Sequence, residues 1–282
     1  RRRLLGGAIV AFSNVISDSA RSSFADAVQR PYWLDRPDRP DPRPRLQAPI
    51  TADLLVVGAG FSGLWTAYEA AVRHPDLDIV LVDGGQVGHA ASGRNGGFVA
   101  ASLTHGLAKG MARWPKEMPE LERLGRENLD AIAATVAAEG IDCDFIRSGE
   151  VAVAVEGYQI DDLVETVEQA RGLGVDLELL TAEQVRARLD SPTYLAGVAD
   201  AHGVAMVDPA RLAWGLAAAC ERRGVRIFEN TPVRSLGRIG AGVLAGTDHG
   251  RVRAGRVALA TSASPPLLSR LGNYIVAVYD SV

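Results

Sequence analysis

The chain has 282 residues, of which 47% are hydrophobic and 23% are charged, and its formal net charge is -4 at pH 7. This is the composition of a globular protein with enough apolar material for one large core or two smaller ones. A pI near 5.8 argues against nucleic acid as a partner, because phosphate backbones are bound by concentrated basic charge. No apolar stretch is long enough to cross a bilayer, so no membrane partner is expected.

The cysteines and histidines predict no metal site. Cys143 and Cys220 are far apart in the sequence and form no C-x-x-C pair, so neither a disulfide scaffold nor a thiolate site is indicated. The five histidines show no i, i+4 spacing with an acidic partner. We therefore expect two reduced, structural thiols.

The N-terminal region has two readings. It begins RRRLLGGAIVAF, a basic start with a short apolar run, and Ala25-Asp26-Ala27 resembles a small-x-small cleavage site. Export through a twin-arginine-like signal is the alternative to the expected cytoplasmic protein with a surface extension. Residues 31–49 then hold six of the 14 prolines, which predicts an extended linker or arm, and the folded domain should begin near Thr51.

The hydrophobic periodicity predicts alternating strands and helices. A buried parallel strand at 53–58, a helix at 61–73 and a second strand at 78–83 form a βαβ unit. Further helices are predicted at 119–139, 158–172 and 181–189, and a half-exposed strand at 149–156. A short strand leads to Asp208 as N-cap with Pro209 in the first turn, a helix runs to about Arg223, and a strand covers 225–228. Strands near 232–237, 241–246, 250–253 and 256–260 then form a β-meander.

Three glycines between the first strand and helix have the spacing of a dinucleotide-binding turn. Gly58 permits the tight turn, Gly60 lets a pyrophosphate approach the backbone, and Gly63 allows the helix to pack closely on the strand. Asp83 ends the next strand, 20 residues past Gly63, where a carboxylate accepts hydrogen bonds from ribose hydroxyls and repels a 2′-phosphate. The alternative is a glycine-rich turn in another α/β protein, with Asp83 only capping a strand.

A second glycine-rich loop favours FAD over NAD. Residues 88–97 read GHAASGRNGG and follow the second strand, where a doubly wound sheet opens its crevice. Small residues here let a large flat ligand approach the backbone, and Arg94 and Asn95 add polar anchors.

Four stretches in the same order resemble a known family: VVGAGFSGLWTA, GHAASGRNGG, GVAMVDPARLAWGLAAACERRGVRIFENTPV and RVALATSASPPLLSRL. They are similar to the D-amino-acid-oxidase-like FAD-dependent oxidoreductases, and within them to the γ-glutamylputrescine-oxidase-like amine oxidases, whose PYWLD-type arm is also matched. The resemblance runs from about residue 31 to the end of the chain. It implies an α/β fold: a Rossmann-like FAD-binding domain with a parallel sheet and a β-meander, interleaved with a partial α+β substrate domain.

The resemblance also implies roles for individual residues. The pyrophosphate would face the first glycine turn, Asp83 would bind the adenosine ribose where the family more often has Glu, and a strand backbone would read the adenine edge. The implied cofactor-binding residues are Gly58, Gly60, Phe61, Ser62, Gly63, Asp83, Ser92, Arg94, Asn95, Gly96, Gly97, Val233, Ala260 and Thr261.

Three further residues bear on how the flavin is attached and on catalysis: His89, His105 and Tyr279. Some relatives attach flavin through a histidine followed by two alanines, as in the GHAA around His89, but noncovalent FAD with an ordinary loop histidine is the expected state. His105 and Tyr279 are catalytic candidates by residue type only, and both are expected to be structural.

By resemblance, a neutral amine substrate would transfer a hydride from its α-carbon to flavin N5, and dioxygen would reoxidise the flavin and release peroxide. Because a cationic amine must first lose a proton, activity should rise with pH. The alternatives are an NAD-dependent dehydrogenase and an inactive flavin-binding remnant. The oligomeric state is not predicted.

The family layout divides the chain into segments: 1–50 an extension and arm, 51–112 and 200–272 the FAD-binding domain, 113–199 the substrate domain, and 273–282 the start of a further substrate-domain strand. Because family members continue beyond this point, we expect an N-terminal part of a longer protein that binds FAD weakly and lacks turnover. Because a sheet edge would be exposed, we also expect the isolated chain to be unstable, prone to aggregation or completed by another chain.

Overall fold

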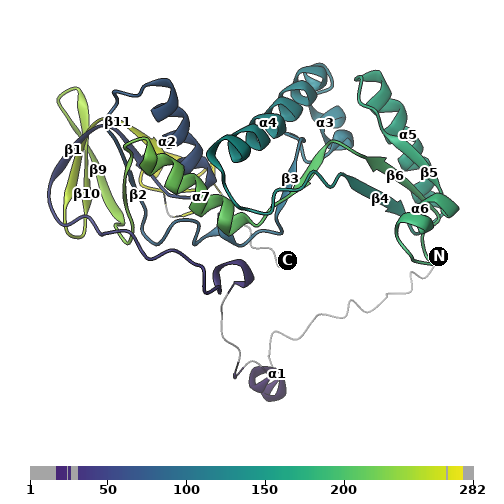
Figure 1. The fold of residues 1–282 in the computed structure, drawn as a ribbon, viewed down its shortest axis with the longest axis horizontal. Coiled ribbons are helices and arrows are strands. Elements are labelled where there is room, and N and C mark those ends of the chain that lie inside the picture. The colour runs from purple at the N-terminus through teal and green to yellow at the C-terminus, as the bar shows by residue number, and fades with distance from the viewer. Residues whose placement is uncertain (1–16, 24, 27–30, 265, 276–282) are drawn as a thin grey trace, which may run out of the picture.

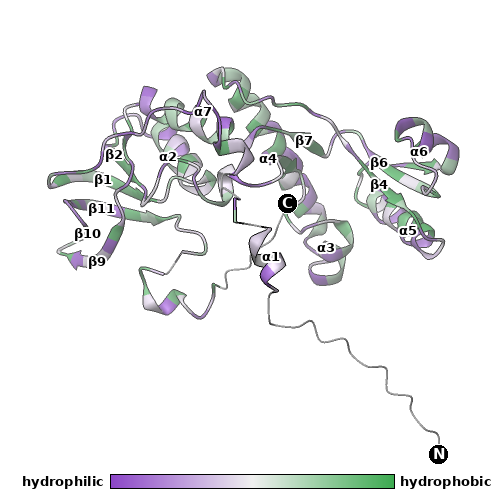
Figure 2. Cartoon of the chain, turned by 90° about the horizontal axis from the view of Figure 1, so that it is seen from below, coloured by the Kyte–Doolittle hydropathy of each residue, from purple (hydrophilic) through white to green (hydrophobic). Residues whose placement is uncertain are grey.

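The structure, a computed structural model, describes residues 17–23, 25–26, 31–264 and 266–275. Two lobes stand apart in Figure 1: one holds a six-stranded sheet and the other a three-stranded sheet. A two-stranded ribbon and the helix α4 (Met118–Glu139) lie between them, and the view from below shows the same separation (Figure 2). The predicted mixed α/β class, with a largely parallel sheet, is confirmed.

The six-stranded sheet is built on the predicted βαβ unit. Its order is β8 (Arg226–Phe228), β2 (Ile79–Val82), β1 (Ile50–Val57), β11 (Arg251–Leu259), β10 (Gly242–Thr247) and β9 (Val233–Ile239). The first four strands run parallel, whereas β9, β10 and β11 form the predicted antiparallel meander. The carboxyl ends of β1, β2 and β11 therefore meet at one edge of the sheet.

Alternate residues of the central strands pack on opposite faces of this sheet, as the period of a strand requires. Val56 and Leu81 face the helices α2 (Phe61–Arg73) and α7 (Pro209–Arg222), which contact each other. Leu55 and Val80 instead pack in a second cluster with Leu46, from the chain before β1. Every residue of β2 is buried, because apolar side chains cover both faces of the sheet at this strand.

The predicted start of α7 is confirmed in detail. The Asp208 carboxylate accepts the backbone N–H groups of Ala210 and Arg211 at 3.0 and 3.1 Å, and Pro209 occupies the first turn. The helix ends at Arg222, one residue before the predicted end.

The second lobe is an antiparallel sheet in the order β4 (Glu150–Ala154), β6 (Ala196–Asp200) and β5 (Glu178–Thr181). The helices α5 (Tyr158–Gly172) and α6 (Ala182–Arg188) pack on it, at the predicted positions. The linking ribbon pairs β3 (Phe98–Ala100) with β7 (Val204–Met206), and α3 (Leu107–Arg113) precedes α4. Short helices lie at Asp18–Ser22, Tyr32–Leu34, Ala91–Gly93 and Ser269–Leu271, labelled α1, η1, η2 and η3.

Two parts of the strand prediction are wrong. The strands predicted at 250–253 and 256–260 are one strand, β11, because Gly255 lies inside the ladder rather than in a turn. A Cβ at Gly255 would lie 3.0 Å from the carbonyl oxygen of Asp53, so this glycine allows close backbone approach. The short strands β3, β5 and β6 were not predicted.

Some predictions concern residues that the structure does not describe, and others are not tested by the structure. The basic start of the chain, Ala27 and Tyr279 lie outside the described residues, as does most of 273–282; residues 273 and 274 form a turn. The domain boundaries stay a prediction. Among the described residues, no helix is long and apolar enough to cross a membrane, and no group of His, Cys, Asp or Glu could hold a metal ion.

Candidate functional site

A cavity of about 610 Å³ lies at the carboxyl ends of β1, β2 and β11. This is the crevice where a doubly wound sheet binds its ligand. Four loops line it: Val57, Gly58 and Gly60; then Asp83, Gly84, Gly88, His89, Ala90, Ala91 and Ser92; then Pro232, Val233 and Arg234; and finally Ala260, Thr261, Ser262, Ser264, Pro266 and Leu267. The lining is mostly small side chains and backbone.

The first glycine turn presses α2 against the sheet. Gly58 has φ +111°, and a Cβ there would lie 2.4 Å from the carbonyl oxygen of Ala260. A Cβ at Gly63 would lie 1.8 Å from the carbonyl oxygen of Gly58, so no side chain fits between the turn and the first helical turn. Gly60 caps the helix in an extended conformation and lines the cavity. The turn thus delivers a helix N-terminus, with its partial positive charge, to the cavity.

The loop 88–97 crosses this helix N-terminus. Phe61 N–H donates to Ser92 Oγ at 2.9 Å, and Gly88 N–H donates to the carbonyl oxygen of Ala59 at 3.1 Å. A Cβ at Gly60 would lie only 2.9 Å from Ser92 Oγ. Gly60 and Ser92, both predicted cofactor-binding residues, are therefore adjacent in the cavity wall.

Other predicted residues of this loop make contacts that hold its shape. Asn95 Nδ2 donates to the carbonyl oxygens of Ala91 and Ser92 at 3.1 and 3.0 Å, while its Oδ1 accepts Gly97 N–H at 2.9 Å. Arg94 Nε donates to the backbone carbonyl of His89 at 2.7 Å. Direct contact of Arg94, Asn95, Gly96 and Gly97 with a cofactor stays a prediction.

Asp83 has a bracing role that was not predicted from the sequence. Its side chain is 11% exposed; Oδ2 accepts Ala59 N–H at 2.6 Å and Oδ1 accepts Gly85 N–H at 2.7 Å. The carboxylate thereby joins the first glycine turn to the second loop. A carboxylate has about four acceptor positions, so positions remain for ribose hydroxyls. An Asp two residues before a glycine is the local signal for the second contact.

His89 lies at the Asp83 end of the cavity. Its Nδ1 donates to the carbonyl oxygen of Gln86 at 2.8 Å and is 3.4 Å from Asp83 Oδ1, and its ring packs over Gly85. The other histidine considered, His105, is exposed in the loop before α3 and does not line the cavity. Covalent flavin attachment through His89 stays untested.

The remaining predicted residues divide into three that line the far wall of the cavity and three in α2 that do not line it. Val233, Ala260 and Thr261 line the cavity, and Ala260 N–H donates to the carbonyl oxygen of Val57 at 2.8 Å. Phe61, Ser62 and Gly63 form the first turn of α2. The sequence reasoning missed the wall formed by Pro232, Ser262 and Leu267, because nothing local marks these residues as facing a ligand.

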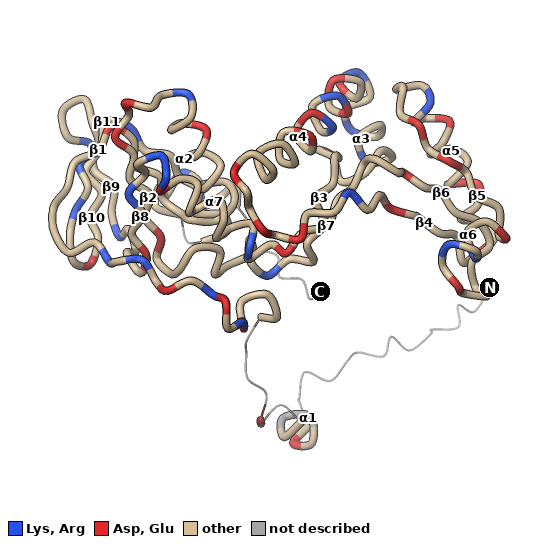
Figure 3. Tube along the Cα trace, in the orientation of Figure 1, with Lys and Arg blue, Asp and Glu red and all other residues tan. Residues whose placement is uncertain are grey.

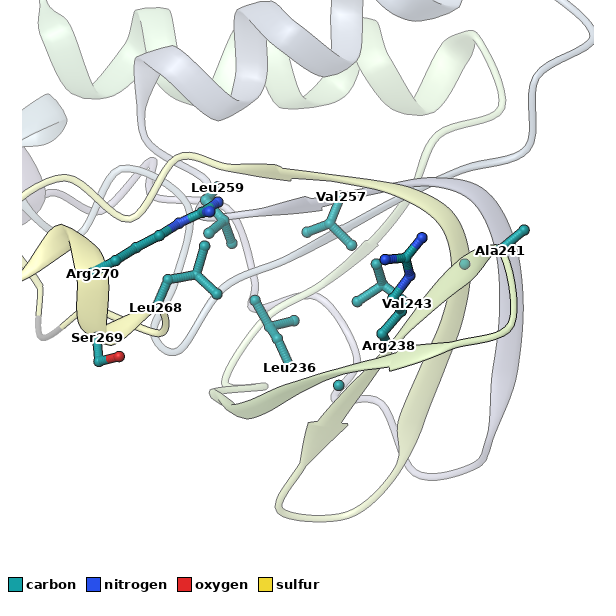
Figure 4. A pocket seen from close by; sticks show the side chains of 11 residues that line it. Leu236, Arg238, Ala241, Val243, Val257, Leu259, Leu268, Ser269 and Arg270 are labelled. Atoms are coloured by element: carbon teal, nitrogen blue, oxygen red, sulfur yellow. The ribbon is translucent and has the colours of Figure 1, made fainter.

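A second cavity, of about 650 Å³, has a different character. It lies between the meander and the segment 268–270, and Figure 4 shows Leu236, Val243, Val257, Leu259 and Leu268 around it with Arg238 and Arg270. Its walls offer apolar side chains rather than a helix N-terminus. The first cavity is therefore the one whose lining suits a dinucleotide.

Comparison of the sequence with known protein families gives a match over residues 53–280, to the family described as FAD dependent oxidoreductase (DAO). The chain belongs to this family. Its cofactor is FAD, which decides against the NAD alternative.

Relatives agree with this membership. The chain is 30% identical to "Probable oxidoreductase OrdL" of Haemophilus influenzae, covering 72% of this chain and 47% of the relative. It is also 30% identical to the gamma-glutamylputrescine oxidoreductase of Escherichia coli, covering 73% and 48%. The chain thus spans about half the length of the curated relatives that it matches.

Solved structures share the fold. Glycine oxidase from Geobacillus kaustophilus matches with a TM-score of 0.65 and 24% identity, covering 76% of this chain and 56% of that one. L-Amino acid deaminase from Proteus myxofaciens matches with a TM-score of 0.64 and 19% identity, covering 79% and 48%.

Proposed function

We propose that the 610 Å³ cavity is the FAD site of this chain. The observation that carries the proposal is the glycine turn that brings the N-terminus of the 13-residue helix α2 to the cavity wall. The pyrophosphate would lie against Gly60 and Ser92, and the adenosine against Asp83 and Val233. These residues fit the group, because a Cβ at Gly58 or Gly60 would meet neighbouring atoms within 3 Å, so that backbone and no bulky side chain faces the place where a pyrophosphate must approach closely.

The whole protein, we further propose, oxidises the C–N bond of an amine or amino acid, with dioxygen as acceptor. The likeness to gamma-glutamylputrescine oxidoreductase supports this substrate class. FAD, when bound, supplies the hydride-accepting group. The chain's own residues bind and orient the cofactor. The titratable residues of the lining include Asp83 and His89, which lie together at the end assigned to adenosine. No catalytic residue is assigned in this chain.

The neutral form of the amine is the reactive one in this scheme, so turnover of the whole protein should rise with pH until the substrate is deprotonated. A rate that falls as the substrate loses its proton would argue against an amine donor.

The visible spectrum of the purified chain tests the cofactor proposal. A flavin spectrum whose absorbance passes a filter after denaturation supports noncovalent FAD. Absorbance retained with the denatured protein would instead show covalent attachment, with His89 as the first residue to replace. A colourless chain that takes up no added FAD would refute the proposed site in this chain.

A further inference from the structure

Residues 31–46, the part of the predicted segment 31–49 that is called the arm below, are fixed to the lobe with the six-stranded sheet, here called the FAD-binding lobe, rather than forming a loose linker. In Figure 1 the arm runs beneath the lobe toward β1, and Figure 3 shows basic and acidic residues alternating along it. Leu34 and Leu46 are 6% and 2% exposed, so both ends are anchored in the core. Arg43 pairs with Glu221 at 2.7 Å, and Arg36 pairs with the N-cap residue Asp208.

The contacts of the arm with the rest of the chain include three on the segment after β2. Trp33 Nε1–H donates to the carbonyl oxygen of Asn95 at 2.9 Å. The Leu34 side chain packs against Gly93, where a Cβ would lie 3.0 Å from Leu34 Cδ2. Arg39 donates to the side chain of Gln86.

The buried carboxylate of Glu229 also joins the arm to the segment after β2. Glu229, whose side chain is 3% exposed, accepts Arg43 N–H at 2.8 Å through Oε2 and Val87 N–H at 2.9 Å through Oε1. The arm therefore contacts the segment 86–95 directly at Gln86 near its start and at Gly93 and Asn95 near its end, and Glu229 links Arg43 to Val87.

The end contact matters most for the cofactor. The Asn95 side chain bonds Ala91 and Ser92, and Ser92 lines the cavity beside Gly60. Holding the Asn95 backbone thus holds Ser92 in the cavity wall. A loop with so many glycines otherwise loses conformational entropy when a ligand fixes it, and that loss weakens binding.

We propose that Trp33 is a positioning residue: its indole N–H fixes the loop 88–97 in the conformation that receives FAD. This inference rests on the proposed FAD site. It assigns the arm a role in cofactor affinity that extends beyond the residues lining the cavity.

The first test is FAD titration of the full 282-residue chain, followed by flavin fluorescence. Trp33→Phe keeps an aromatic ring and removes the donor, and Trp65→Phe is the matched control, a part-buried tryptophan of α2 that packs edge-on against Tyr68. We expect the dissociation constant for FAD to rise about fivefold in Trp33→Phe, as for one ordinary hydrogen bond, and to stay unchanged in the control. Equal affinities of the wild type and Trp33→Phe would overturn the inference.

Limited trypsin digestion without FAD gives a second readout, because Arg94 is exposed within the loop. Cleavage after Arg94 should be about fivefold faster in Trp33→Phe and unchanged in Trp65→Phe, if cleavage follows the open population. If the wild type binds no FAD, the proposed function fails, and the cleavage rate still decides whether Trp33 holds the loop. Unchanged cleavage, or equal acceleration in both variants, would show that Trp33 has no specific hold on it.

Discussion

Replacing Glu139 should destabilise the FAD-binding lobe in a pH-dependent way. Its side chain is 7% exposed at the end of α4 and accepts Tyr68 Oη–H at 2.8 Å and Arg222 Nη2–H at 2.9 Å. Arg223 also pairs with it, and its guanidinium lies 4.7 Å from the centre of the Tyr68 ring. One carboxylate therefore joins α2, α4 and α7, the helices around the core beside the cavity.

These contacts, above all that with Arg223, lower the pKa of Glu139 from 4.5 to about 2. A lowered pKa contributes stability above the unfolded value, near pH 4.5, and the contribution is lost as pH falls toward 2. The whole shift corresponds to about 3 kcal/mol. Because the side chains of Arg222 and Arg223 are 52% and 31% exposed, solvent screening reduces this to about 1–2 kcal/mol.

Thermal denaturation of Glu139→Gln measures this contribution. At pH 7 the midpoint should fall by roughly 2–8 °C relative to wild type, and the difference should narrow as pH falls from 5 to 2. Glu120→Gln is the control, since Glu120 pairs with Arg123 on the surface with its side chain 59% exposed, and its midpoint should not change measurably. A Glu139→Gln deficit of the same size at pH 3 and pH 7 would refute the electrostatic account.

Three further predictions concern the cavity and the thiols. Gly60→Ala should displace the Ser92 hydroxyl and weaken FAD binding at least tenfold, measured by fluorescence titration, whereas Gly157→Ala, where an added Cβ meets open space, should bind as wild type. Asp83→Asn offers a single acceptor oxygen to two backbone donors, so it should lower both the denaturation midpoint and FAD affinity; an unchanged midpoint would contradict the bracing role. Burial raises the pKa of the Cys143 thiol to about 11 and that of Cys220 to about 12, so neither should react with a thiol reagent at pH 8 until the chain is unfolded.

The sequence predicted the parts of the fold that follow from local pattern. The strand β2 is wholly apolar, α2 follows three spaced glycines, and Asp208 with Pro209 marks the start of α7. Each signal is contained within a few residues. The strand β6 reads AGVAD and β5 reads ELLT, and neither shows clear alternation or β-branched enrichment, so their pairing depends on partners far away in the sequence.

The candidate site divides in the same way. The glycine positions were predictable because Gly58 and Gly63 allow contacts that no side chain permits. The bracing contacts were not, because Asp83 bonds a residue 24 positions earlier and Trp33 bonds one 62 positions later. Pattern reasoning assigned Asp83, Arg94 and Asn95 to the cofactor, whereas the structure gives each of them protein contacts as well.

The contacts of Asp83, Trp33 and Glu229 meet a requirement of the cavity that its small wall residues cannot meet, which is to keep its loops ordered. Its walls must be small, so that a pyrophosphate can approach the backbone, yet small residues leave the loops without side chains to hold them in place. In this chain Glu229 and Trp33 hold the loops from outside the walls, and Asp83 holds them from within the wall. Substitutions in the walls should therefore change the shape that FAD meets, whereas Trp33→Phe should leave that shape in place and change how often the loop adopts it.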